Sequence, residues 1–222
     1  MLNQEFLFSA PQVYAITDPD LLPGEKLYRA VEHAIMGGCR WIQYRNKTDL
    51  NSNGVMQARI LKSICDAQNA TLVINDSLEL ALGVGATALH LGQGDGDVAN
   101  ARRQLGDSAI IGVTCHDSLA LAEKAVNDGA SYIAFGRFFL SQTKPNARPA
   151  PISLIAEARK RFPNIPIAVI GGIDLHNVSP LVAEGANLIA VCNSLFAAPN
   201  ITHQTELFFK TINAAHQAAS KR

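Results

Sequence analysis

The chain has 222 residues, of which 48% are hydrophobic and 17% are charged, and its 19 basic and 19 acidic side chains give a formal net charge of zero. This composition is that of a globular protein, and the length accommodates one α/β barrel of roughly 200 to 250 residues. The zero balance excludes binding to nucleic acid or to an anionic membrane by bulk charge, because such binding needs an excess of basic residues on one face. An anionic ligand must therefore be met by a local cluster of cations.

The cysteines and the first residues bear on the cellular compartment. Cys39, Cys65, Cys115 and Cys192 lie far apart, without a C-x-x-C pair, so we expect reduced and mostly buried thiols rather than a zinc site or a disulfide framework. The first residues lack a basic start followed by an apolar stretch, and no segment approaches the ~20 apolar residues of a membrane span. We therefore expect a cytoplasmic protein.

Short apolar runs rich in Val and Ile alternate along the chain with longer segments of mixed polarity. The runs predict strands: VYAIT (13–17), CRWIQYR (39–45), LVIND (72–76), ALHLG (88–92), AIIGVT (109–114), YIAFG (132–136), IAVIGG (167–172) and LIAVCN (188–193). Segments between them place apolar residues at helical spacing: EKLYRAVEHAIMGG (25–38), VMQARILKSICDAQ (55–68), LALAEKAVNDG (119–129) and ISLIAEARKRF (152–162). The tail after Phe196 predicts a last helix, in which LFFKTINAAHQAA (207–219) is amphipathic.

The strands are apolar throughout rather than alternating, which indicates burial on both faces of a parallel sheet flanked by helices. Three joins repeat one another, since Gly85, Gly129 and Gly185 each precede an Ala and a strand that starts shortly after it. Glycines at these positions are typical left-handed ends of helices. Eight repeated βα units predict an eight-stranded parallel TIM (β/α)8 barrel that occupies residues 1–222 as one domain. An open doubly wound sheet is the alternative.

In a parallel barrel the active site lies at the carboxyl ends of the strands, and these ends are polar here. Gln43, Arg45 and Lys47 alternate, so on an extended backbone their side chains project to the same side. Two cations and an amide on one face form a cradle for a phosphate or a diphosphate. A solvated strand end is the alternative interpretation.

Asp76 and Asp95 end adjacent predicted strands, so we expect their carboxylates to lie near each other. The two carboxylates could instead form salt bridges with the neighbouring cations. Mg²⁺, however, is usually held by one or two carboxylates together with phosphate oxygens and water. A basic strand end, two aspartates and the further cation Lys144 therefore describe a magnesium-diphosphate site better than an acid/base pair.

Three other motifs carry less information about chemistry. Gly171 and Gly172 follow a buried strand, and a phosphate site in the loops after strands seven and eight is common in this fold, although a Gly-Gly turn is often only a turn. His90 lies within a predicted buried strand, and we expect a hydrogen-bonded core residue. Cys115 and His116 suggest nucleophilic catalysis as an alternative, but adjacent residues on a strand point to opposite faces, which disfavours a nucleophile-base pair.

These motifs together resemble the thiamine-phosphate synthase family. The likeness is carried by YAITD (14–18), QYRNK (43–47), VINDSLELALGVGATALHLGQGD (73–95), IGVTCH (111–116), TKP (143–145), IGGI (170–173) and EGANLIAV (184–191). The resemblance extends over most of the chain and implies a barrel enzyme that joins hydroxymethylpyrimidine diphosphate to hydroxyethylthiazole phosphate, plain or carboxylated. The products are thiamine phosphate and pyrophosphate.

The resemblance also implies roles for particular residues. The pyrimidine diphosphate would be held by Gln43, Tyr44, Arg45, Asn46, Lys47, Asn75, Thr114 and Lys144, of which Arg45, Lys47, Thr114 and Lys144 are the catalytic candidates. Asp76 and Asp95 would bind Mg²⁺. The thiazole phosphate would be held by Ser141, Gln142, Thr143, Gly172, Cys192 and Asn193. The family's route is dissociative: the C–O bond to the diphosphate breaks first, and the thiazole nitrogen captures the resulting pyrimidine methylene cation.

This chain departs from the family pattern on the thiazole phosphate side. Ser141-Gln142 stands where the family has Thr-Pro, Cys192-Asn193 stands where it has Val-Ser, and Arg137 stands where Pro is more usual. Two other functions remain open: a thiazole tautomerase that uses His116 in acid/base chemistry, and a non-catalytic barrel that binds thiazole phosphate. Neither uses a metal-diphosphate site. The sequence predicts small-molecule substrates and no nucleic-acid or membrane partner, and it leaves a homo-oligomer open.

Overall fold

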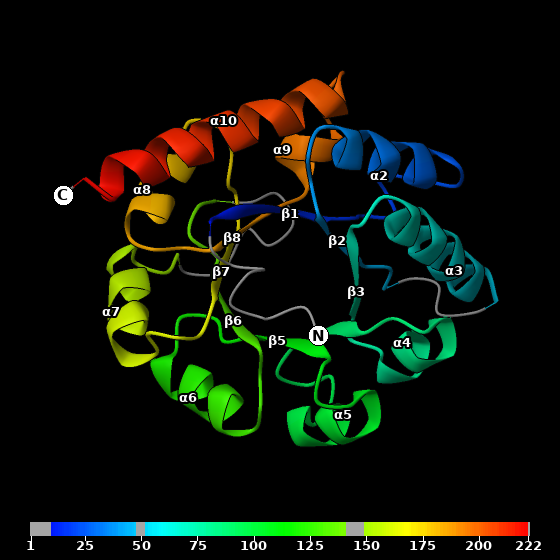
Figure 1. Ribbon diagram of the computed structural model, residues 1–222, viewed down its shortest axis with the longest axis horizontal. Helices are drawn as coiled ribbons and strands as arrows, with labels where there is room; N and C mark the ends of the chain where they lie inside the picture. The colour runs from blue at the N-terminus through cyan, green and yellow to red at the C-terminus, as the bar shows by residue number, and fades with distance from the viewer. Residues whose placement is uncertain (1–9, 48–51, 141–148, 222) are drawn as a thin grey trace.

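The computed structural model describes residues 10–47, 52–140 and 149–221. Its strands are β1 (Gln12–Ile16), β2 (Trp41–Tyr44), β3 (Thr71–Asn75), β4 (Ala88–Leu91), β5 (Ile110–Thr114), β6 (Tyr132–Phe135), β7 (Ile167–Ile170) and β8 (Leu188–Val191). Each strand pairs in parallel with its neighbours, and β1 also pairs with β8, as Val13 with Ile189 (Figure 1). The predicted TIM barrel is confirmed, and the alternative of an open sheet is wrong because β1 and β8 close the ring.

Helices surround this ring of strands (Figure 1). They are α2 (Lys26–Met36), α3 (Ser52–Ala67), α4 (Leu78–Val84), α5 (Val98–Leu105), α6 (Leu119–Asn127), α7 (Ser153–Arg161), α8 (Val178–Ala183), α9 (Asn193–Phe196) and α10 (Ile201–Ala219). The last helix begins at Ile201, within the segment after Phe196 that the sequence predicts to be helical, and the Asn200 side chain caps it by accepting the N–H of His203. Every predicted strand except β5 ends one or two residues earlier than expected, and β2 ends at Tyr44.

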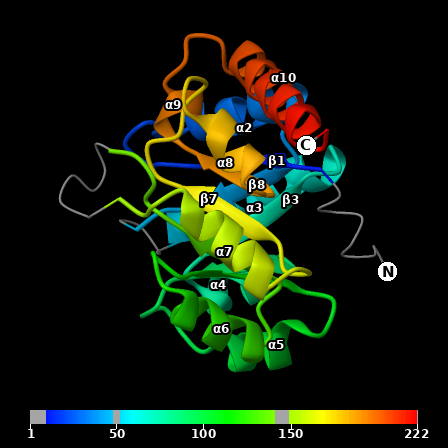
Figure 2. The same cartoon turned by 90° about the vertical axis from the view of Figure 1, so that its left-hand side faces the viewer.

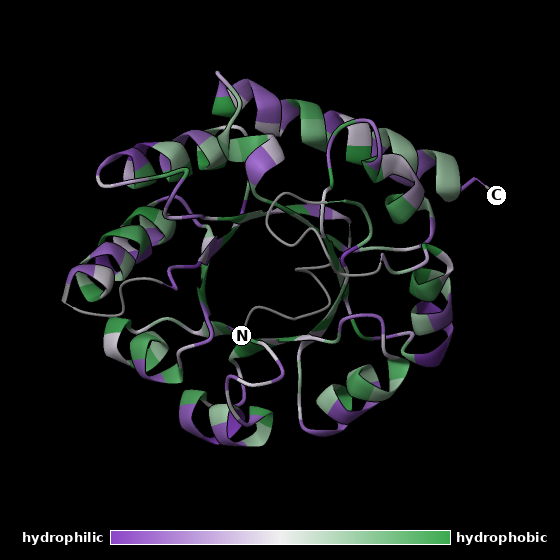
Figure 3. Cartoon of the chain, turned by 180° about the vertical axis from the view of Figure 1, so that it is seen from behind, coloured by the Kyte–Doolittle hydropathy of each residue, from purple (hydrophilic) through white to green (hydrophobic). Residues whose placement is uncertain are grey.

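Two layers of apolar side chains hold the barrel together. One fills the interior of the ring and includes the aromatic residues Tyr14, Trp41 and Tyr132. The other lies between the strands and the helices, and Ile42 and Tyr44 of β2 belong to it. Because successive side chains of a strand point to opposite faces, each strand contributes to both layers, which explains its unbroken apolar sequence. Each of the surrounding helices carries both hydrophilic and hydrophobic residues (Figure 3).

The three repeated Gly-Ala joins have the same construction. Gly85, Gly129 and Gly185 adopt φ values of 69°, 98° and 102°, which confirms the predicted left-handed helix ends. The second and third joins are each held by a different arginine side chain. Arg102 donates to the Gly129 carbonyl at 2.9 Å, and Arg159 donates to the Gly185 carbonyl at 2.9 Å. The three joins lead into β4, β6 and β8, so every second strand in this part of the ring is entered in the same way.

Helix α10 packs against both α8 and α2, on the outside of the strand ring (Figures 1 and 2). The approach to α2 depends on Gly37, because a Cβ there would lie 2.6 Å from Thr205 Cβ and 2.5 Å from the Thr202 carbonyl oxygen. Thr202 also donates its hydroxyl to the His33 carbonyl at 3.0 Å. Within the described residues, no helix combines the length and the apolar character needed to cross a membrane.

Candidate active site

The carboxyl ends of β2, β3 and β4 bring one cation and two carboxylates together. Lys47 Nζ lies 3.3 Å from Asp76 Oδ2. The carboxyl groups of Asp76 and Asp95 lie close enough for each to feel the charge of the other, which confirms that the residues that follow these two adjacent strands are neighbours. Asp76 is partly buried and Asp95 is exposed, so the pair faces the mouth of the barrel.

The backbone fixes both carboxylates. Asp76 has a left-handed φ of 64°, and its N–H donates to the His90 carbonyl of β4 at 2.8 Å. Asp95 Oδ2 accepts the N–H of Gly92 at 3.0 Å. A Cβ at Gly92 would lie 2.4 Å from the same Asp95 oxygen, so only glycine lets the carboxylate approach this closely. Backbone groups at and just after the strand ends therefore hold the two carboxylates in place.

The electrostatics of this pair fit a divalent cation. Although Asp95 is exposed, partial loss of water around its carboxyl group raises its pKa above the ordinary value, and the negative charge of the nearby Asp76 raises it further. Two crowded carboxylates repel each other unless a cation or a proton lies between them. Within the described residues there is no group of three or more His, Cys, Asp or Glu side chains that could hold a metal alone. Mg²⁺ is usually bound by one or two protein carboxylates, and phosphate oxygens and water occupy its other coordination positions.

The three predicted cradle residues do not form one row of side chains. Gln43 is buried and donates Nε2–H to the Tyr14 hydroxyl at 2.6 Å, inside the barrel. Burial raises the pKa of the Cys192 thiol, and Arg45 lies close enough for its charge to offset part of that rise, whereas Lys47 pairs with Asp76. The reason is that β2 ends at Tyr44, so the two-residue alternation of an extended strand stops there. Both cations follow β2, but Arg45 lies toward the end of β8 and Lys47 toward the end of β3.

Tyr44 and Asn46 line a pocket beside the strand end. The Tyr44 hydroxyl donates to Gln57 Oε1 of α3 at 2.7 Å, and Asn46 Nδ2 donates to the Tyr44 hydroxyl at 3.3 Å. Together with Arg45 and the loop after β1, these residues surround a cavity of about 190 Å³. Thr17 Oγ1, at the end of β1, accepts the backbone N–H of Arg45 at 3.0 Å. Tyr44, Arg45 and Asn46 therefore border an open, polar cavity, and Lys47 is not among its lining residues.

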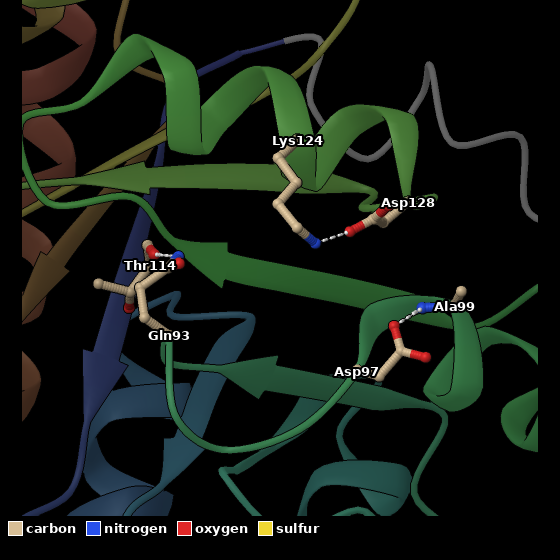
Figure 4. A network of polar contacts seen from close by, with 6 residues as sticks. All are labelled: Gln93, Asp97, Ala99, Thr114, Lys124 and Asp128. Atoms are coloured by element: carbon tan, nitrogen blue, oxygen red, sulfur yellow. Dashed lines mark hydrogen bonds and ion pairs between the residues drawn. The ribbon is translucent and has the colours of Figure 1, made fainter.

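Thr114 and Asn75 complete the described part of the pyrimidine diphosphate candidates. Thr114 ends β5, and its hydroxyl oxygen lies 2.8 Å from His90 Nε2. Its carbonyl accepts Gln93 Nε2–H at 2.5 Å, which ties the loop after β4 to the end of β5 (Figure 4). Asn75, the last residue of β3, pairs in register with His90. Lys144 lies outside the described residues.

His90 is a buried, hydrogen-bonded residue, as the sequence predicts. Its Nδ1 lies 2.9 Å from the Tyr132 hydroxyl and its Nε2 faces Thr114. Burial lowers the pKa of His90 to about 4, although the charge of Asp95 raises it in part, so the ring is neutral at pH 7. Tyr14 and Tyr132, whose hydroxyls continue this network, are not among the site residues that the sequence predicts. A tyrosine within an otherwise apolar strand was the signal, because a buried hydroxyl needs a partner.

The thiazole phosphate candidates that can be described lie after β7 and β8. The Gly172 carbonyl accepts Asn177 Nδ2–H at 2.8 Å, and the Ser194 hydroxyl donates to the Ile173 carbonyl at 2.6 Å, which joins the two loops. Cys192 precedes the short helix α9, and Asn193 begins it with an exposed side chain. Ser141, Gln142 and Thr143 lie outside the described residues.

The Cys115-His116 pair is not arranged for nucleophilic catalysis. Cys115 is fully buried, and burial raises the pKa of its thiol to about 12. His116 is exposed, with a left-handed φ of 53°. A buried neutral thiol and an exposed imidazole confirm that these neighbours do not act together.

Comparison with known proteins gives a consistent set of relatives. The family model described as thiamine monophosphate synthase matches residues 13–195. A thiamine-phosphate synthase of Saccharophagus degradans is 50% identical over 195 residues, which cover 87% of this chain and 89% of that protein. One of Marinobacter nauticus is 50% identical over 186 residues, covering 84% of this chain and 83% of that protein. Among solved structures, a thiamine phosphate pyrophosphorylase of Pyrococcus furiosus aligns with a TM-score of 0.82 at 26% identity, over 92% of this chain and 96% of that chain.

Proposed function

This chain belongs to the thiamine monophosphate synthase family, and from that membership we propose that it joins hydroxymethylpyrimidine diphosphate to hydroxyethylthiazole phosphate, plain or carboxylated, and releases pyrophosphate. Membership makes the chain an enzyme, a transferase of thiamine biosynthesis. The observation that carries the proposal for its substrates is the position of Asp76 and Asp95 beside Lys47, at the mouth of the barrel.

The cations after β2 act on the leaving group. Loss of pyrophosphate concentrates negative charge on the departing oxygens, and positive side chains that are already in place stabilise that charge. Lys47 and Arg45 provide positive charge after the end of β2, and Lys144, which lies outside the described residues, would provide a third positive charge. In the free protein Lys47 pairs with Asp76, which keeps the ammonium group at the mouth of the site.

Asp76 and Asp95 would hold Mg²⁺ together with diphosphate oxygens. When bound, the ion neutralises the charge of the leaving diphosphate. The chain's own contribution is to fix two carboxylates, through the Gly92 N–H and the left-handed backbone of Asp76, where the diphosphate arrives. The route that fits this arrangement is dissociative, because charge neutralisation and positioning suffice and no general base is needed. The thiazole nitrogen then captures the pyrimidine methylene cation.

The thiazole phosphate would lie against the loops after β6, β7 and β8, at Ser141, Gln142, Thr143, Gly172, Cys192 and Asn193. The two last loops are joined through Ser194 and Ile173, so the acceptor site has a rigid side. Asn193 is exposed and its amide donates hydrogen bonds, as the serine of the family pattern does.

Product formation tests the proposal directly. Purified protein is incubated with Mg²⁺, hydroxymethylpyrimidine diphosphate and hydroxyethylthiazole phosphate, and thiamine phosphate and pyrophosphate are measured. Both products are expected in equal amounts with Mg²⁺, and neither with an excess of chelator. The absence of both products, while a carboxylated thiazole phosphate is isomerised, would overturn the proposal in favour of a tautomerase. Binding of thiazole phosphate without any turnover would favour the non-catalytic barrel.

A further inference from the structure

A continuous chain of hydrogen bonds crosses the interior of the barrel. It runs from Gln43 Nε2 to the Tyr14 hydroxyl at 2.6 Å, to the Tyr132 hydroxyl at 2.9 Å, to His90 Nδ1 at 2.9 Å, and from His90 Nε2 to Thr114 Oγ1 at 2.8 Å. Its members come from β2, β1, β6, β4 and β5. Gln43, Tyr14, Tyr132 and His90 are buried, and both ends of the chain are candidates for contact with the pyrimidine diphosphate.

The packing of the barrel interior fixes the positions of the tyrosine hydroxyls. The Tyr132 ring meets Tyr14 and Trp41 edge to face, at centroid distances of 6.2 Å and 6.4 Å. It enters the interior because residue 112 is a glycine: a Cβ there would lie 1.9 Å from Tyr132 Cζ. A buried hydroxyl without a partner costs roughly 1–3 kcal/mol. The ring packing and the cost of an unpaired hydroxyl together hold the chain in one arrangement.

The chemistry of the donors sets a direction along the chain. An amide Nε2 only donates, so the Tyr14 oxygen accepts from Gln43 and the single Tyr14 proton is given to Tyr132. Tyr132 in turn gives its proton to His90 Nδ1. A neutral imidazole with an accepting Nδ1 carries its proton on Nε2, which faces the Thr114 oxygen. Thr114 therefore receives a hydrogen bond, and its own proton is left to donate elsewhere.

We propose that His90 is a positioning residue: through the buried chain from Gln43 it is held as the Nε2–H tautomer, which fixes the Thr114 hydroxyl as a hydrogen-bond donor toward an acceptor atom of the pyrimidine diphosphate. Only the identity of the ligand rests on the proposed function. Thr114 is partly exposed at the mouth of the barrel, whereas His90 and both tyrosines lie below it and are buried. His90 thus acts through Thr114 and not on the substrate.

The tautomer is tested without any substrate. Nitrogen-15 NMR of the full protein labelled in its histidines distinguishes a protonated from an unprotonated ring nitrogen, and His90 is assigned through its bonds to the backbone. The expected result is a protonated Nε2 and an unprotonated Nδ1. A protonated Nδ1 would mean that the chain runs in the opposite direction, with Thr114 donating to His90, and would overturn the proposal. This outcome is independent of whether the chain makes thiamine phosphate.

A pair of variants tests the action through Thr114. Tyr132→Phe removes the hydroxyl that sets the tautomer but keeps the ring, and Thr114→Val removes the hydroxyl that is positioned. Each is expected to raise the KM for the pyrimidine diphosphate about 10-fold, the equivalent of one hydrogen bond, with the KM for thiazole phosphate unchanged. The double variant is expected to be no worse than Thr114→Val alone, because Tyr132 acts through that residue. Additive losses would overturn the proposal.

Thr205→Val is the matched control for the loss of a buried hydroxyl. Thr205 is fully buried in α10 and donates to the Ile201 carbonyl at 2.8 Å, away from the strand ends. Its KM values are expected to equal those of the unmodified protein. If no turnover is found at all, the affinity for the pyrimidine diphosphate is measured by calorimetry on the same variants. The NMR result then still decides the tautomer, so failure of this proposal and failure of the proposed function are distinguishable.

Discussion

Lys47 Nζ lies 3.3 Å from Asp76 Oδ2, and this ion pair joins the ends of β2 and β3 at the mouth of the barrel. Asp76 is at the same time in contact with Asp95, the acid that follows β4. One carboxylate thus faces a cation on one side and a second carboxylate on the other. If the two aspartates bind a metal ion, their loss should reduce turnover. If they only form structural salt bridges, their loss should reduce stability.

Asp95→Asn separates the two interpretations. Replacing one carboxylate by an amide removes a proposed magnesium ligand, and we expect turnover to fall by roughly 100-fold or more. The melting temperature should stay level or rise, because the repulsion from Asp76 is also removed. Turnover and thermal unfolding of the same preparations provide the measurement.

Asp97→Asn is the matched control for that substitution. Asp97 caps α5 by accepting the N–H of Ala99 at 3.1 Å, and its carboxylate is exposed (Figure 4). Asparagine caps helices about as well as aspartate, so both turnover and stability should be unchanged. If Asp95→Asn turns over normally but melts early, the two aspartates serve the fold and not the metal.

Gly112→Ala should destabilise the protein by about 1–3 kcal/mol or more, because the added Cβ would overlap the Tyr132 ring in the barrel interior. Gly83 provides the opposite case, since a Cβ there meets nothing within 4 Å and the residue lies inside α4. Gly83→Ala should stabilise the protein by about 0.5–1 kcal/mol. Urea unfolding measures the change in the free energy of unfolding for both variants. Equal changes would contradict the packing described for Tyr132.

Arg102 and Arg103 are adjacent in α5, but their side chains make very different numbers of hydrogen bonds. Arg102 donates to the carbonyls of residues 106, 107, 109 and 129 and to the Ser131 hydroxyl, whereas Arg103 is exposed and reaches Asn100 Oδ1 at 3.4 Å. We expect Arg102→Met to lower the free energy of unfolding by at least about 2 kcal/mol and Arg103→Met to change it by less than about 0.5 kcal/mol. Similar losses for both would show that the brace between α5 and β6 contributes nothing.

The four thiols predict how stability depends on alkaline pH. Burial raises the pKa of Cys39 from 9.0 to about 11 and those of Cys65, Cys115 and Cys192 to about 12. Between pH 9 and these values the folded state binds more protons than the unfolded state, so the free energy of unfolding must fall as pH rises. The loss is absent below about pH 9, the thiol pKa in the unfolded state.

Alkylation measures the same property of the thiols. At pH 8 the native protein should react with iodoacetamide far more slowly than the protein in urea, because the thiolate is the reactive form. Rapid alkylation of Cys39 or Cys115 in the native state, followed by mass spectrometry of the peptides, would contradict the burial described here.

Much of this protein could be predicted from local patterns. Unbroken apolar runs that alternate with amphipathic segments predict a parallel barrel, because only burial on both faces of a sheet favours such strands. Asp76 and Asp95 could be paired from sequence because residues that follow adjacent parallel strands must be neighbours. Gly85, Gly129 and Gly185 were predictable because a left-handed helix end strongly favours glycine.

Only the tertiary structure decided which side chains share the barrel interior. The sequence by itself determined that Gln43, His90 and Thr114 lie in or at the ends of strands, but not that Tyr14 and Tyr132 connect them. Hydrogen bonds between strands depend on register and on where each strand stops, and these follow from the closure of the ring. The end of β2 at Tyr44 likewise separates Gln43 from Lys47, although their spacing in sequence places them in one row.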